Sequence, residues 1–204
     1  MVWSVVGPAS FALAAARGSR LVPGYSRRDE PISALAAKGS PAARVMVPGF
    51  LALSLGTLGL ARDVRGSAAA PAPVPAMLGA ASLAIAGAGL ARCSDRTCPT
   101  RLLGDSDVTL SDDLHAAFST ATFGLWIAIP LVAAKKAEAA GDRYRRWSRR
   151  LGGFTATTLV ISGLLARTSS ERWSGWAQRV MLASALAWYP LAGVTASRRR
   201  TVSG

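Results

Sequence analysis

The chain has 204 residues, of which 50% are hydrophobic and only 17% are charged, and its formal net charge is +13 at pH 7. A nucleic-acid-binding protein of this charge would spread its basic residues over a polar surface, whereas here short basic clusters separate long apolar stretches. We therefore exclude nucleic acid as a partner and expect an integral membrane protein, because a charged residue is costly at the middle of a bilayer. Arginine and alanine far outnumber lysine, which is typical of a GC-rich bacterial genome, so we expect a multi-pass protein of the bacterial cell membrane.

Six apolar stretches follow one another along the chain, and we interpret them as the membrane helices of one domain over residues 1–204. A helix needs about 20 residues to cross about 30 Å of hydrocarbon. The first and fifth stretches are short for this, so a five-helix chain and a start codon further upstream are alternatives. The first stretch is not typical of a signal peptide, because no basic residue precedes it and Arg17 follows it at once. The predicted spans are 2–16, 45–61, 74–91, 115–134, 151–166 and 177–196.

The basic residues of the loops predict the orientation of this all-α polytopic bundle. Seven basic residues fall within 135–150 and three more within 198–200. The positive-inside rule places both segments in the cytoplasm, and exactly two spans separate them, so the bundle is predicted to be N-in and C-in. The loop 17–44 then faces outward although it carries six basic residues, which indicates a local use for them.

That first outer loop contains a short predicted helix over residues 31–38. Asp29 is a suitable N-cap and Gly39 a suitable helix end. The apolar residues of this helix share one face, so we expect it to lie in the membrane interface. It is either a surface connector or a lid whose Arg27, Arg28 and Asp29 bind an anionic headgroup.

Two stretches of the chain resemble a known family. The run from Arg27 to Gly39, followed by residues 45–51, and the sequence Leu114-His115-Ala116-Ala117 are similar to the bacterial membrane family called domain of unknown function 998 (DUF998), which is common in actinobacteria. Its members have an "ISAL" helix after the first span and a histidine at the head of a later span. The resemblance implies a multi-span membrane fold and no particular activity. The short first span departs from the family pattern.

The second outer loop holds the only two cysteines, Cys93 and Cys98. Both are predicted on the oxidising side of the membrane, so we expect a disulfide, with free thiols as the alternative. We expect no metal site, because tetrahedral zinc takes three or four ligands and only His115 could join the two cysteines.

The head of the fourth span carries Ser111, Asp112 and the only histidine, His115. Ser111 or Asp112 can cap the helix, and acidic residues suit a helix N-terminus. Alternatively, His115 beside these carboxylates binds protons or a substrate. A hydrolytic triad of Ser33, His115 and Asp112 would also require a geometry that a sequence does not show.

From these features we expect a non-enzymatic membrane protein that binds or moves a lipid or small amphiphile at the outer face. We expect no cofactor, because a single histidine excludes a bis-histidine haem and nucleotide-binding motifs are missing from the sequence. The alternatives are a membrane-embedded enzyme that acts on a lipid headgroup through His115 and a carboxylate, and a structural subunit of a membrane complex. Beyond membrane lipids, the sequence leaves the ligand and the homo- or hetero-oligomeric state open. The predicted ligand-binding residues are Arg27, Arg28, Asp29, Ser33, Asp112 and His115.

Overall fold

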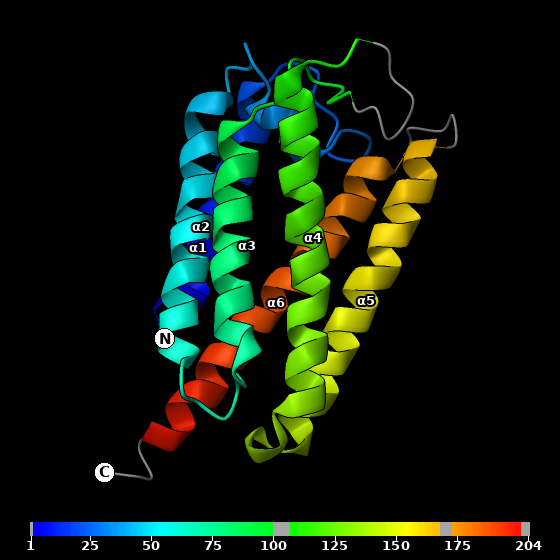
Figure 1. Cartoon of the computed structure of the whole chain (residues 1–204). Helices are drawn as coiled ribbons and strands as arrows, with labels where there is room; N and C mark the ends of the chain where they lie inside the picture. The colour runs from blue at the N-terminus through cyan, green and yellow to red at the C-terminus, as the bar shows by residue number, and fades with distance from the viewer. Residues whose placement is uncertain (1, 100–106, 168–172, 201–204) are drawn as a thin grey trace.

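The computed structural model describes residues 2–99, 107–167 and 173–200, and over these ranges the chain is all-helical. The predicted fold class is thus confirmed. Six α-helices run up and down in a single bundle (Figure 1). They are α1 (Trp3–Leu21), α2 (Ala43–Val64), α3 (Pro73–Leu90), α4 (Leu110–Lys136), α5 (Asp142–Arg167) and α6 (Ser174–Arg200), with two short 3₁₀ helices, η1 (Ile32–Ala36) and η3 (Glu138–Ala140).

Four of these helices, α2, α3, α4 and α6, are long and apolar enough to cross a membrane. The other two lie alongside them (Figure 1) and turn large apolar side chains outward, among them Leu13 of α1 and Ile161 of α5, which are 70% and 45% exposed. Contiguous exposed apolar surface is a liability in water and is expected against lipid. The fold is therefore that of a helical membrane bundle, and the count of six spans remains a prediction.

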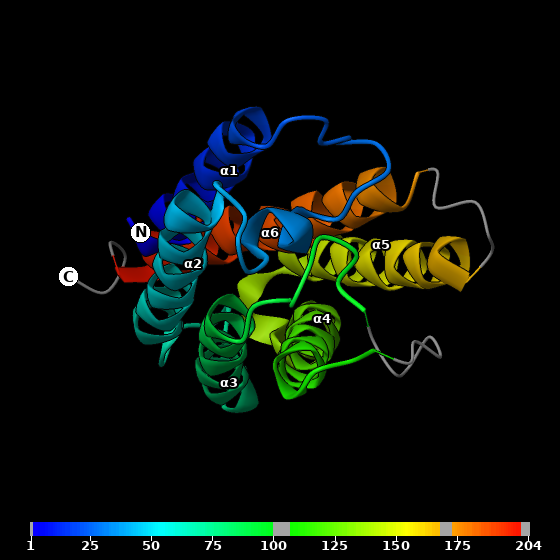
Figure 2. The ribbon, with the colours of Figure 1, turned by 90° about the horizontal axis from the view of Figure 1, so that it is seen from above.

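Each helix packs against the next one in the chain, and α6 crosses the bundle obliquely to contact α1 and α2 (Figure 2). The α1–α2 contact is especially close, since a Cβ built on Gly7 would lie 2.9 Å from the Cα of Gly56. Small residues of this kind let membrane helices approach closely. The start of α1 and the end of α6 lie at the same end of the bundle (Figure 1), as an even number of helices requires.

A directed chain of hydrogen bonds ties α4, α6 and α2 together in the core. Trp126 Nε1 donates to the Tyr189 hydroxyl over 3.0 Å. Tyr189 lies 2.9 Å from Thr57 Oγ1, which itself donates to the carbonyl of Leu53. Because the Thr57 hydroxyl proton is already donated to Leu53, the Tyr189 hydroxyl is the donor to Thr57 Oγ1. Trp126 and Tyr189 are 4% and 1% exposed, so these bonds satisfy groups that water does not reach.

The predicted helix over 31–38 is shorter and lies elsewhere than expected. It is the 3₁₀ helix η1, it begins after Pro31, and Asp29 does not cap it. Its Leu35 is fully buried and Ala34 is 1% exposed. Seen from above, η1 lies over the middle of the bundle (Figure 2). The prediction of an interfacial helix was wrong, because its apolar residues pack against the protein core and not against lipid.

Candidate functional site

A cavity opens directly beneath η1, between that helix and α1, α2, α3, α4 and α6. The space between these elements, together with its open mouth, is about 430 Å³. The lining residues are Phe11, Ile32, Ser33, Phe50, Leu53, Ile85, Ala88, His115, Ser119, Thr122, Phe123, Trp126, Gln178 and Leu182. We call this space the η1 cavity.

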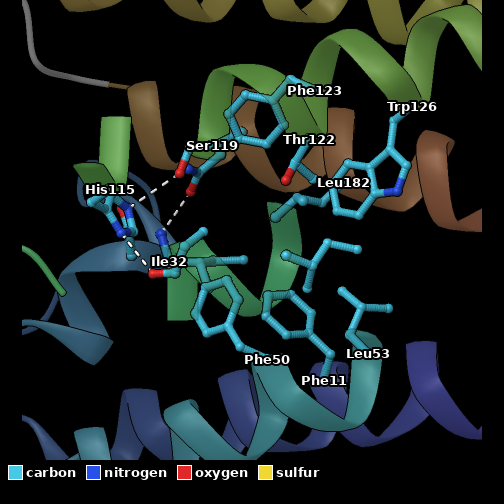
Figure 3. Close-up of a pocket in the computed structure, with 14 residues that line it drawn as sticks. Phe11, Ile32, Phe50, Leu53, His115, Ser119, Thr122, Phe123, Trp126 and Leu182 are labelled. Atoms are coloured by element: carbon cyan, nitrogen blue, oxygen red, sulfur yellow. Dashed lines mark hydrogen bonds between the residues drawn. The ribbon is translucent and has the colours of Figure 1, made fainter. Parts of the chain in front are cut away.

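The lining is divided into a polar and an apolar region. His115 and Ser119 lie at one end of the cavity, whereas Leu53 and Trp126 lie toward the other (Figure 3). The rings of Phe11 and Phe50 lie side by side, with centroids 5.1 Å apart in an edge-to-face arrangement. Such a division suits a molecule with one polar end and one apolar end.

His115 is held in one tautomer by the end of α3. Its Nδ1 lies 2.8 Å from the carbonyl oxygens of both Ala88 and Ala91. Because a carbonyl oxygen only accepts, Nδ1 carries the proton, and Nε2 of the neutral ring is an acceptor. The ring is 7% exposed, and its Nε2 lies 3.3 Å from Ser119 Oγ. The imidazole thus binds the C-terminal end of α3 with one nitrogen and accepts from the Ser119 hydroxyl with the other, which leaves the Ser119 oxygen as an acceptor at the cavity.

Two further polar side chains reach the cavity from α6 and η1. Gln178 Oε1 accepts from the backbone N–H of Ile32 over 2.6 Å, so the Gln178 amide nitrogen keeps its two N–H donors. Ser33 Oγ lies 3.5 Å from Cys98 Sγ. The polar end of the cavity is therefore built from three separate elements, α4, α6 and η1.

The cysteine loop braces η1 from the outside. Cys93 and Cys98 lie at disulfide-bonding distance, as predicted, with their Cα atoms 5.0 Å apart. The carbonyl of Cys93 accepts from the backbone N–H of Lys38 over 2.9 Å. Arg96 forms an ion pair with Glu30, with a shortest N–O distance of 2.7 Å. The loop thus contacts residues on both sides of η1.

Arg28 and Asp29 hold the start of α6. The Asp29 carboxylate accepts from Arg28 Nε over 2.9 Å and from the backbone N–H of Trp173 over 3.2 Å. The Asp29 carbonyl accepts from the Ser174 hydroxyl over 2.6 Å. The hydrogen bond from Arg28, followed by that from Ser26, lowers the pKa of Asp29 to about 2. These groups serve as a helix cap, and neither Arg28 nor Asp29 lines the cavity.

Asp112 also serves a helix end. Its carboxylate accepts from the backbone N–H and the hydroxyl of Thr109 over 2.9 Å and 2.6 Å, and Thr109 accepts in return, which is a capping box. The other carboxylate oxygen accepts from the backbone N–H of Ser94 over 2.6 Å. The N-cap is thus Thr109, and the prediction of Ser111 or Asp112 was wrong. Because Asp112 turns back toward Thr109, it does not join Ser33 and His115 in a triad.

Of the six predicted ligand-binding residues, Ser33 and His115 meet at the η1 cavity. Arg27 donates to Ser19 and, like Arg28, Asp29 and Asp112, is not among the lining residues. Sequence reasoning missed Ser119 and Gln178. The spacing of four residues between His115 and Ser119 on one helix was a usable signal, whereas no local pattern marks Gln178. Among the described residues, no group of three or more histidines, cysteines or acids is placed to hold a metal.

The comparison with known proteins gives one family match, which extends from α1 to α6. A family model described as a protein of unknown function (DUF998) matches residues 5–195. All the residues that line the cavity fall inside this range. Neither the search of curated proteins nor the search of solved structures returned a match.

Proposed function

The chain belongs to the DUF998 family of proteins of unknown function, and we propose that it binds a small amphiphile in the η1 cavity. The observation that carries the proposal is the division of the cavity lining into an apolar part around Phe11, Phe50 and Trp126 and a polar end at His115. Binding sites for small molecules combine a mostly apolar wall with a few polar groups that fix orientation.

The position of the cavity supports binding at one face of the membrane. The cavity lies under η1, at the end of the bundle that the positive-inside rule assigns to the outer side. We place the protein in the bacterial cell membrane with this end outward, so that an amphiphile would enter from the outer leaflet. A cavity at one end of the bundle supports binding and offers no argument for movement across the membrane.

The test is to fill the cavity with a larger side chain. Ile85 is 1% exposed and lines the cavity, whereas Leu83, on the same helix, is 74% exposed and turns outward. The protein in phosphatidylcholine nanodiscs would be exposed to a monoacylglycerol with a photoreactive chain, and labelled peptides would be mapped by mass spectrometry. Ile85→Trp should reduce labelling of the cavity residues at least tenfold, and Leu83→Trp should leave it unchanged. Equal labelling in both variants, at matched thermal stability, would contradict the proposal.

A second candidate function rests on the contact between Ser119 and His115. Hydroxyls of Thr122, Thr155 and Thr195 donate to the carbonyl four residues back, whereas Ser119 pairs with His115 Nε2. A neutral imidazole next to a serine can take the hydroxyl proton while Oγ attacks an ester carbonyl, as in serine hydrolases. An enzyme of this type would react with a fluorophosphonate probe at Ser119, and Ser119→Ala would abolish the label. An unlabelled wild-type protein would leave binding as the function.

A further inference from the structure

The hydrogen-bonding groups of the η1 cavity define the head of the ligand. His115 Nε2 accepts from the Ser119 hydroxyl, because Nδ1 carries the proton, and the Ser119 oxygen therefore keeps its own acceptor sites for the cavity. The Gln178 amide nitrogen is a donor, because Oε1 already accepts from Ile32. A hydroxyl group on the ligand matches this pair, since it can donate to Ser119 Oγ and accept from the Gln178 amide.

Among the described residues, none of those that line the cavity is an aspartate, glutamate, lysine or arginine. Two charged residues that are close in the sequence to lining residues, Arg179 and Glu30, bind other groups of the protein. Arg179 donates to the carbonyls of Glu30 and Gly175 and to the Tyr25 hydroxyl, and Glu30 pairs with Arg96. A charged head inside the cavity would lose its hydration without gaining a counter-ion, which costs far more than the burial of a hydrogen-bonded neutral group.

We propose that the ligand is an uncharged single-chain amphiphile with a hydroxyl head, such as a long-chain alcohol or a monoacylglycerol. The hydroxyl donates to Ser119 Oγ, which His115 orients, and accepts from the Gln178 amide, and the chain lies between Phe11, Phe50 and Trp126. This inference rests on the proposed function, because it specifies the ligand class of the same cavity.

The experiment compares three probes that carry the same photoreactive chain and differ only in the head: a monoacylglycerol, a fatty acid carboxylate and an alkyl trimethylammonium. Each is added at pH 7.5 to the protein in phosphatidylcholine nanodiscs, and labelled peptides are mapped. Peptides that contain Phe50 or Trp126 should be labelled at least tenfold more by the monoacylglycerol than by either charged probe. Equal or stronger labelling by a charged probe would overturn the ligand class while the proposed function stood. Failure of all three to label the cavity would overturn both.

Two variants test the named contacts. In Ser119→Ala the acceptor in the cavity is lost while His115 keeps its contacts with the Ala88 and Ala91 carbonyls, so monoacylglycerol labelling should fall about two- to tenfold. Gln178→Glu keeps an acceptor for Ile32 and replaces the donor with a carboxylate. It should weaken labelling by the monoacylglycerol and raise labelling by the trimethylammonium probe. Leu114→Ala, next to His115 but 43% exposed, is the control and should change neither. An unchanged probe preference in Gln178→Glu would contradict the proposal.

Discussion

At the scale of single residues, the carboxylates near the cavity hold the fold together and do not line the site. Asp29 caps the start of α6, and Asp112 caps α4 while it fixes Ser94. Asp29 precedes η1 and Asp112 lies in the first turn of α4, and each is close in the sequence to a residue that lines the cavity. A carboxylate that caps a helix differs from one that binds a ligand only in the direction in which it points. That direction depends on residues distant in the chain, as when Asp29 accepts from the backbone N–H of Trp173.

The cap at Asp29 predicts a pH dependence. The folded-state pKa of this carboxyl, about 2, lies below its unfolded value of about 3.9. Its contribution to stability is therefore present above about pH 4 and is lost as the pH falls toward 2. The melting temperature of the wild-type protein should exceed that of Asp29→Asn at pH 6, and the difference should shrink between pH 4 and 3. A difference that stayed constant with pH would contradict the role of the ionised carboxylate.

Gly175 is required where α6 meets the first loop. A Cβ built on Gly175 would collide with the backbone carbonyl of Glu30, which a side-chain rotation cannot relieve. We expect Gly175→Ala to lower the free energy of unfolding by about 1–3 kcal/mol, as is usual for overpacking. Gly163→Ala is the matched control, since its Cβ meets nothing within 4 Å in α5, and alanine there should be neutral or stabilising. Thermal melts of both variants in one detergent give the comparison, and equal melting temperatures would refute the steric account.

At the scale of elements, η1 owes its position to contacts from three sides. Gln178 of α6 accepts from the start of η1, Lys38 pairs with the backbone of Cys93, and Ser33 lies against Cys98. The short 3₁₀ helix has few hydrogen bonds of its own, so these neighbours determine whether it covers the cavity.

The disulfide should therefore stabilise η1 more than the rest of the bundle. A bridge that closes so short a loop contributes about 2 kcal/mol by chain entropy. In a Cys93→Ser, Cys98→Ser double variant, we expect faster amide hydrogen exchange at Ile32–Ala36, with exchange in α2 and α3 unchanged. Uniformly faster exchange would show that the bridge stabilises the whole fold, and unchanged exchange at η1 would show that the brace is not needed.

At the scale of the whole molecule, hydrophobic stretches and their spacing predicted the all-helical bundle, because the length of an apolar run is fixed by the thickness of the bilayer. The helix ends were less predictable, as the 27 residues of α4 show: its N-cap is Thr109, outside the apolar run. The cavity was predictable only in part. His115 stood out as the single histidine, whereas Gln178 reaches the cavity only through the packing of α6 against η1. Arg28 and Asp29 do not line the cavity, and the headgroup-binding role that the loop sequence suggested for them stays a prediction.

The predicted orientation can be tested by labelling single cysteines in intact cells. Asp107 and Glu138 are both exposed and lie in the connections before and after α4, at opposite ends of the bundle. A membrane-impermeant maleimide should label Asp107→Cys and should not label Glu138→Cys, because the seven basic residues within 135–150 favour the cytoplasm. The native cysteines, being paired, should not react. The reverse pattern would invert the topology and place the cavity on the cytoplasmic side.

The central claim is that the η1 cavity holds an amphiphile, and the most direct test is an experimental structure of the protein purified from its own membrane. We predict elongated density between Phe50 and Trp126 that ends within hydrogen-bonding distance of Ser119 Oγ, about 2.5–3.0 Å between oxygens. A cavity filled by rearranged side chains, or by ordered water alone, would contradict the claim.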